Sequence, residues 1–143
     1  MAQEFGDRFE ELQESIMEDM RKVYSEKVID HFLNPRNLGR IQPFDGFGEQ
    51  TGSCGDNMRI FVKVEDGRII NASFSTNGCG PSIASGSMVT ELVKGKGIVE
   101  AQRITQDDVL NALGGLPEES LHCALLAANT LKEAIRDYLT FKK

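Results

Sequence analysis

Three cysteines, two of them close to a carboxylate or a histidine, are the residues of this chain best suited to chemistry. The candidate ligands are Cys54, Asp56, Cys79, His122 and Cys123. Thiolates together with an imidazole suit either tetrahedral zinc or an iron–sulfur unit. A carboxylate is a harder ligand than a thiolate and suits cluster iron less well. The mixed set therefore favours a centre whose metal is bound and released over one that holds its metal permanently.

The spacing of the cysteines alone leaves a second interpretation open. The chain has no Cys-x-x-Cys pair, and an unpaired cysteine is often a small apolar residue of the core. Three unrelated core cysteines would therefore also explain the sequence. The glycines around Cys79, the Gly-Asp that follows Cys54 and the histidine before Cys123 argue instead for a shared site.

Residues 75–85 form the segment expected to position Cys79 between a strand and a helix. Pro81 suits the first position of that helix, where its missing N–H costs nothing. Gly78 and Gly80 permit positive φ angles and a close approach of a ligand to the backbone. At a helix N-terminus, unpaired N–H groups and the dipole favour a thiolate, which is the form that binds metal. We expect Cys79 to lie at the start of a helix over residues 81–93.

The rest of the chain predicts an α+β domain. Alternating apolar residues over 58–64 and 69–76 predict two antiparallel strands joined by an Asp66-Gly67 turn, with Ile70, Ala72 and Phe74 on one face. Residues 36–53 are expected to be a loop that leads into an irregular edge strand. The remaining predicted helices cover residues 24–33, 105–113 and 117–139. In the last of these helices, the buried stripe is predicted to contain Leu121, Leu125, Ala128, Leu131, Ile135 and Tyr138.

His31 lies in the predicted helix over 24–33. No cysteine or carboxylate stands near it at a ligand spacing, so we expect an ordinary, partly packed histidine.

Residues 1–22 are predicted to form an acidic amphipathic helix, separate from a domain over 23–143. Its apolar stripe contains Phe5, Phe9, Leu12, Ile16 and Met20. This stripe either packs on the chain's own domain or forms a surface for self-association or for a partner. The stripe alone does not decide between these alternatives.

The composition excludes several functional classes. A net charge of -6 over 143 residues argues against general binding to nucleic acids or anionic membranes. No apolar run approaches the roughly 20 residues of a membrane helix, and the acidic start is unlike a signal peptide. We therefore expect a cytoplasmic protein. Its odd number of cysteines indicates thiols for metal or redox chemistry, not a disulfide framework.

Four motifs in this sequence resemble the IscU/NifU N-terminal family of iron–sulfur cluster assembly scaffolds. They are Tyr-Ser-Glu-Lys-Val-Ile-Asp-His-Phe-Leu-Asn-Pro-Arg-Asn-Leu-Gly over 24–39, Cys-Gly-Asp over 54–56, Gly-Cys-Gly over 78–80 with Ile-Ala-Ser over 83–85, and Leu-His-Cys over 121–123. All four occur in the family's order, between residue 24 and about residue 140. This order makes the resemblance highly specific.

The resemblance implies a three-stranded antiparallel sheet with helices packed mainly on one face, an IscU/SufE-like fold with the ligands at one end. It also implies a scaffold that builds a transient [2Fe–2S] or [4Fe–4S] cluster from Fe²⁺ and sulfur, at a site that Zn²⁺ also occupies. By motif match, the ligands would be Cys54, Asp56, Cys79, His122 and Cys123. Cys123 would be the first persulfide acceptor, since a helix-borne thiolate beside a general base can be activated.

The partners implied by the resemblance are a cysteine desulfurase, a ferredoxin-type electron donor and apo iron–sulfur acceptor proteins. Association with a second copy of the chain is a separate hypothesis, which rests on the apolar stripe of residues 1–22. The family's Leu-Pro-Pro-Val-Lys segment for chaperone recognition is here Leu-Pro-Glu-Glu-Ser over 116–120. This departure puts docking of an Hsp70-type chaperone in doubt.

Two alternatives to a scaffold stay open. A SufU-like zinc-dependent sulfurtransferase would accept persulfide from the desulfurase. Members of that subfamily typically lack the histidine before the last cysteine and carry an insertion between the second and third cysteines, whereas this chain keeps His122 and has no obvious insertion. A structural zinc protein without a transfer role would hold its metal tightly.

Overall fold

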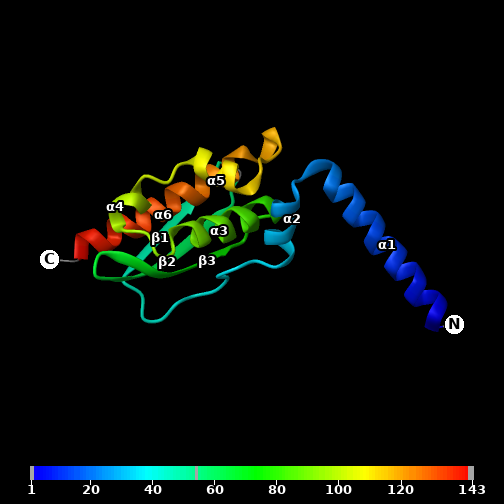
Figure 1. Cartoon of the computed structure of the whole chain (residues 1–143), viewed down its shortest axis with the longest axis horizontal. Coiled ribbons are helices and arrows are strands. Elements are labelled where there is room, and N and C mark those ends of the chain that lie inside the picture. The colour runs from blue at the N-terminus through cyan, green and yellow to red at the C-terminus, as the bar shows by residue number, and fades with distance from the viewer. Residues whose placement is uncertain (1, 54, 142–143) are drawn as a thin grey trace.

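A three-stranded sheet and the helices around it form the computed structural model, which describes residues 2–53 and 55–141 (Figure 1). Cys54, one of the predicted ligands, lies outside the described residues. In chain order, the elements are α1 (Ala2–Val23), α2 (Glu26–Leu33), β1 (Gly46–Thr51), β2 (Asn57–Glu65), β3 (Arg68–Thr76), α3 (Gly80–Val93), α4 (Ile98–Gln102), α5 (Gln106–Leu113), a 3₁₀ turn (Glu118–Ser120) and α6 (Leu121–Phe141).

The sheet is an antiparallel meander in the order β1-β2-β3. Asp66 and Gly67 both have positive φ angles, 53° and 76°, as the predicted two-residue turn requires. Ile60 pairs with Phe74, so alternate side chains of β2 and β3 share one face. The predicted α+β class and the antiparallel sheet are confirmed.

A bulge near the start of β3 changes which isoleucine is buried. Lys63 pairs with Asn71, but the next residue, Val64, pairs with Ile69. One residue of β3 therefore has no partner on β2. Ile69 is consequently fully buried, whereas Ile70 is 46% exposed. The prediction that Ile70 lies on the face of Ala72 and Phe74 is wrong because strict alternation takes no account of a bulge.

The core lies between one face of the sheet and the helices α3 and α6 (Figure 1). Its largest fully buried side chains include Met58, Ile60, Phe74, Leu131 and Ile135. Leu125 is 44% exposed, so its predicted place in the buried stripe of α6 is wrong. Successive helical residues are separated by 100°, which turns Leu125 away from the face that carries Ala124, Leu131 and Ile135.

Local capping fixes the helix boundaries. Ser25 caps α2 by accepting a hydrogen bond from the N–H of Val28. Thr105 and Asp108 form a reciprocal capping box at the start of α5, and Gly114 ends that helix in the left-handed conformation. The predicted helix over 117–139 begins with the 3₁₀ turn and continues as α6, whereas the sequence analysis did not predict α4.

His31 joins α2 to α3. Its Nδ1 lies 2.7 Å from Ser87 Oγ, and that oxygen also accepts a hydrogen bond from the N–H of Arg36 at 2.9 Å. The imidazole is 9% exposed, and burial lowers its pKa below the ordinary value of 6.5. The prediction of a packed histidine is confirmed.

Helix α1 projects away from the sheet and the helices that cover it (Figure 1). Phe9, Leu12 and Ile16 are half-exposed or more, so the stripe does not pack on the chain's own domain in this structure. Among the described residues, no helix has both the length and the apolar composition needed to cross a bilayer.

Candidate metal centre

The predicted ligands that the structure describes gather at one end of the sheet. Here the loop over 52–56 joins β1 to β2, β3 leads into α3, and α6 begins. Because β2 and β3 are antiparallel, the start of one strand lies beside the end of the other, with Met58 opposite Thr76. Segments separated by as many as 67 residues are therefore adjacent at this edge.

Hydrogen bonds fasten the loop of Asp56 to the segment that precedes α3. The N–H of Asn57 donates to Asn77 Oδ1 at 2.8 Å, and the hydroxyl of Thr76 donates to the carbonyl of Asn57 at 2.6 Å. Within the loop, the N–H of Gly52 donates to the carbonyl of Asp56 at 2.7 Å. These bonds position Asp56 next to the N-terminus of α3.

Asp56, His122 and Cys123 bring one potential ligand atom each into a compact group. Within the part of the chain that the structure describes, these atoms all lie within 4.8 Å of one another. His122 Nε2 is 3.6 Å from Cys123 Sγ. Successive residues of a helix point 100° apart. The side chains of His122 and Cys123 nevertheless reach one centre beside the first turn of α6. Cys123 is buried, whereas Asp56 and His122 are half-buried.

Cys79 lies beside this compact group without belonging to it. It is the N-cap residue of α3, as predicted, and it is exposed. Its side chain makes no capping hydrogen bond. Cys79 also borders a hollow of about 300 Å³ whose other walls include Met20, Tyr24, Phe32 and Pro81.

Ser82 contacts two of the candidate ligands and was missed by the sequence analysis. Its hydroxyl donates to Asp56 Oδ2 at 2.8 Å, and its Oγ lies 3.4 Å from Cys123 Sγ. Ser82 is fully buried. The sequence does contain one indication of this role. Ser82 follows Cys79 by three residues, and residues at that spacing are neighbours at the start of a helix such as α3.

The glycines around Cys79 allow neighbouring side chains to pack closely and do not adopt unusual backbone angles. Neither Gly78 nor Gly80 has a positive φ, in contrast to what the sequence suggested. A Cβ on Gly78 would lie 2.6 Å from Ser82 Oγ and 2.9 Å from Asp56 Oδ2. A Cβ on Gly80 would lie 3.3 Å from the ring of Phe32. Gly78 therefore leaves room for the side chains of Asp56 and Ser82 to meet.

The donor set fits a transition-metal ion or cluster iron. Thiolate, imidazole and carboxylate ligands bind such metals at about 2.0–2.3 Å, so atoms within 4.8 Å of one another converge on one ion after small side-chain rotations. The exposed Cys79 stands next to the group, and Gly55 follows Cys54 with a φ of 88° and open space around it. A half-buried centre at the molecular surface is suited to loading and release.

Comparisons with known sequences assign the chain to a family. The sequence model of the NifU-like N-terminal domain matches residues 23–143. The iron–sulfur cluster assembly scaffold protein IscU 1 of Archaeoglobus fulgidus is 53% identical over 117 residues, covering 81% of this chain and 76% of that protein. The scaffold protein IscU of Escherichia coli is 50% identical over 124 residues, covering 81% and 94%.

Solved structures share the fold. The N-terminal part of a NifU-like protein from Brucella abortus superposes with a TM-score of 0.64 at 18% identity, over 83% of this chain and 96% of that one. A protein described as a scaffold for the SUF system of Fervidobacterium islandicum superposes with a TM-score of 0.64 at 24% identity, over 78% and 96%. At these identities, the two likenesses show the fold alone.

Proposed function

This chain belongs to the family of NifU-like N-terminal domains, and from that membership we propose that it is a scaffold for iron–sulfur cluster assembly. The cluster is its cargo, which is built on the chain from iron and sulfur and then passed to apo-proteins. The observation that carries the proposal is the convergence of Asp56, His122 and Cys123 within 4.8 Å, beside an exposed Cys79. Relatives at 53% and 50% identity that are named as such scaffolds support it.

The proposed ligands come from three separate segments. Cys54, Cys79 and Cys123 supply thiolates for iron, with Asp56 and His122 as further ligands. The cargo is a [2Fe–2S] cluster, with [4Fe–4S] as a second form, and Zn²⁺ binds to the same side chains. The domain that does this work is proposed to span residues 23–143, and residues 1–22 are an extension that precedes it.

Sulfur is proposed to arrive as a persulfide on the cysteine of a desulfurase. The thiolate of Cys123 attacks the outer sulfur of that persulfide and forms a new S–S bond. The original S–S bond breaks, and the desulfurase cysteine leaves as a thiolate, so the exchange needs no external oxidant or reductant. His122, whose Nε2 is 3.6 Å from Cys123 Sγ, is placed to take the thiol proton. Because Cys123 is buried, the exchange requires local opening of the site.

The other proposed partners follow from the chemistry of the cargo. Reduction of persulfide sulfur to sulfide needs electrons, which a ferredoxin-type donor would supply. Apo iron–sulfur proteins accept the finished cluster. We do not propose an Hsp70-type chaperone, because residues 116–120 depart from the expected recognition segment.

Anaerobic reconstitution tests the scaffold proposal. The full chain is mixed with Fe²⁺, cysteine and a cysteine desulfurase, and its visible spectrum is followed before an apo-ferredoxin is added. We expect a cluster spectrum that then transfers to the ferredoxin. Persulfide on the chain without a cluster, together with tightly retained zinc, would indicate a SufU-like sulfurtransferase instead. Retained zinc without either reaction would indicate a structural zinc protein.

Asp56→Ala tests the proposed role of the carboxylate in release. A carboxylate binds cluster iron less covalently than a thiolate, so we expect the variant to pass its cluster to apo-ferredoxin more slowly than the wild type. Stopped samples analysed by circular dichroism in the visible range give both half-times. Equal half-times at equal cluster loading would contradict a role for Asp56 in lability.

A further inference from the structure

Helix α1 supplies no ligand in the proposed scaffold function, and all but its last residue precede residues 23–143, which the family model matches. It nevertheless carries an exposed apolar stripe. Phe9, Leu12, Ile16 and Val23 are 53%, 58%, 50% and 54% exposed. Their spacings of three, four and seven residues follow a heptad pattern, the repeat of helices that pair along a seam. Exposed apolar side chains that lie in one line mark an interaction surface.

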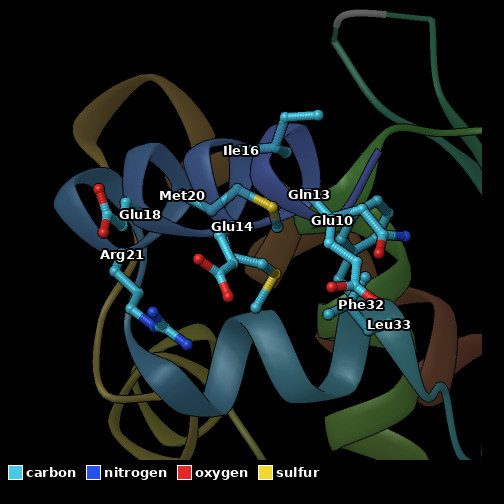
Figure 2. Close-up of a pocket in the computed structure, with 10 residues that line it drawn as sticks. Glu10, Gln13, Glu14, Ile16, Glu18, Met20, Arg21, Phe32 and Leu33 are labelled. Atoms are coloured by element: carbon cyan, nitrogen blue, oxygen red, sulfur yellow. The ribbon is translucent and has the colours of Figure 1, made fainter. Parts of the chain in front are cut away.

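Most of the stripe does not face the chain's own domain. Between α1 and α2 lies a groove of about 790 Å³, whose α1 wall includes Glu10, Glu14 and Glu18 together with Met17, Met20 and, from the stripe, Ile16. Figure 2 shows Glu14 between the two helices, whereas Ile16 projects on the far side of α1 from α2. Glu14 is thus turned toward the domain, whereas Phe9, Leu12 and Val23 do not line the groove and are left for another molecule.

We propose that this stripe pairs with the same stripe on a second copy of the chain, as a short antiparallel coiled coil. With Phe9, Ile16 and Val23 at a positions and Leu12 at a d position, the seam is apolar over most of its length. The e and g positions that flank the seam, from residue 8 onward, hold only Arg8, Gln13, Ser15, Met20 and Lys22. None of these residues is acidic. The glutamates occupy the outer b, c and f positions, so two copies can approach although α1 as a whole is acidic.

The charges along α1 favour the antiparallel orientation. Residues 4–14 contain five acidic residues and one basic residue, for a net charge of -4, whereas residues 15–23 contain two of each and are neutral. Antiparallel pairing places the acidic half of one helix beside the neutral half of the other. It also places Asp19, the charged residue at a d position, opposite Phe9 of the second copy, whereas parallel pairing would oppose two Asp19 carboxylates.

The coiled coil would be short, and its dimer therefore concentration-dependent. Helix α1 has 22 residues, about three heptads, and helical pairs of this length are marginal in water. The proposal is independent of metal binding, because none of the stripe residues is a candidate ligand.

Sedimentation equilibrium of the full chain over a concentration series tests the pairing. We expect the wild-type mass to rise toward twice the monomer mass with concentration. The double variant Leu12→Ala/Ile16→Ala should stay monomeric. The control double variant Glu11→Ala/Glu14→Ala, which changes c and f positions away from the seam, should dimerise like the wild type. Far-ultraviolet circular dichroism confirms that both variants keep their helix. A wild type that is monomeric throughout, or a seam variant that still dimerises, would overturn the proposal.

Disulfide trapping tests the orientation. Two chains are made in a background in which Cys54, Cys79 and Cys123 are replaced by serine, one with Leu12→Cys and the other with Ile16→Cys. In an antiparallel pair, position 12 faces position 16 of the second copy. Oxidation of an equimolar mixture should therefore join unlike chains in excess of the statistical share. An excess of like-with-like disulfides would show a parallel pair and overturn the stated orientation.

Discussion

At the scale of single residues, the hydroxyl of Ser82 couples two candidate ligands. It carries one proton, which it donates to Asp56 Oδ2 at 2.8 Å, while Cys123 Sγ lies 3.4 Å from the same oxygen. Outer contacts of this kind orient ligands and tune their affinity for a metal. Ser82 is thus a positioning residue that holds the carboxylate and the sulfur in a fixed relation before metal arrives.

Ser82→Ala is expected to weaken binding of Zn²⁺ or Co²⁺ to the apo-protein by about 10- to 100-fold, the usual cost of removing an outer contact to a ligand. The charge-transfer absorption of bound Co²⁺ should also shift, because the sulfur and the carboxylate are no longer held together. Competition with a chromophoric chelator gives the affinity, and the visible spectrum gives the geometry.

Ser85→Ala is the matched control for this change. Ser85 is equally buried and lies one turn further along α3, but its hydroxyl donates to the carbonyl of Pro81 within the helix. This variant should bind Co²⁺ with the affinity and spectrum of the wild type. If both variants lost affinity in proportion to their thermal stability, Ser82 would have only a packing role.

The sequence predicts which residues are candidate ligands better than it predicts their burial and contacts. Residue types and neighbours marked Asp56, Cys79, His122 and Cys123, since the chain has only three cysteines and two histidines, and Asp56 is close to one of those cysteines. The burial of Cys123, the exposure of Cys79 and the contacts of Ser82 depend on how α3 and α6 meet. Those are tertiary facts that a local pattern does not contain.

At the scale of elements, β1 lies unusually close to α6. A Cβ on Gly48 would be 2.4 Å from the carbonyl oxygen of Thr130, and one on Gly46 would be 2.3 Å from that of Ala134. The two glycines are on the same face of β1, because they are two residues apart. This close approach sets the position of α6 against the sheet, and with it the position of Cys123 at the beginning of that helix.

Gly48→Ala should destabilise the fold by about 1–3 kcal/mol, as expected when a methyl group is forced into a packed contact. Chemical denaturation measures the free energy of unfolding. Gly52→Ala is the control, because its nearest neighbour would be at 3.4 Å, an ordinary contact, and its effect should be below about 1 kcal/mol. Equal stabilities of the two variants would show that α6 can shift away from β1 at little cost.

The contact between α2 and α3 is expected to depend on pH through His31. Burial lowers the pKa of this imidazole, and Arg36 acts in the same direction, whereas Asp30 and Glu91 partly offset them. The unfolded chain therefore takes up the proton first, at the ordinary pKa of 6.5. The folded state is favoured fully above that pH and loses stability as the pH falls below it.

His31→Asn keeps an acceptor for Ser87 but removes the titration. The metal-free variant should lose less stability than the metal-free wild type when the pH is lowered through 6.5, the ordinary pKa of histidine. Thermal unfolding at a series of pH values checks this difference. Parallel curves for the two proteins would assign the acid sensitivity to other groups.

At the scale of the whole molecule, the general architecture follows from sequence patterns, and the exceptions have physical causes. Apolar alternation, the Asp66-Gly67 turn and the cap at Thr105 are local signals, and the strands and helices they predict are present. The bulge that exchanges Ile69 for Ile70 is set by pairing between strands. The exposure of α1 depends on which surfaces meet, so the amphipathic stripe alone did not decide it.

Metal binding is expected to stabilise the whole fold, since its candidate ligands join the loop after β1 to the start of α6. A ligand that binds only the folded state raises the free energy of unfolding, and a clip that closes a long chain loop is particularly effective. Zn²⁺ should therefore raise the melting temperature in scanning calorimetry, and a chelator should reverse the rise. Asp56→Ala should show a smaller rise. An unchanged melting temperature at saturating zinc would mean that the metal binds at exposed side chains only.

Met20 and Phe32 line both the groove between α1 and α2 and the hollow beside Cys79. The two spaces therefore share a partition made of flexible thioether and aromatic side chains. A molecule that fills one space restrains the rotamers that shape the other. The appended helix is in this way mechanically linked to the surroundings of a cargo-binding thiol, although it contributes no ligand itself.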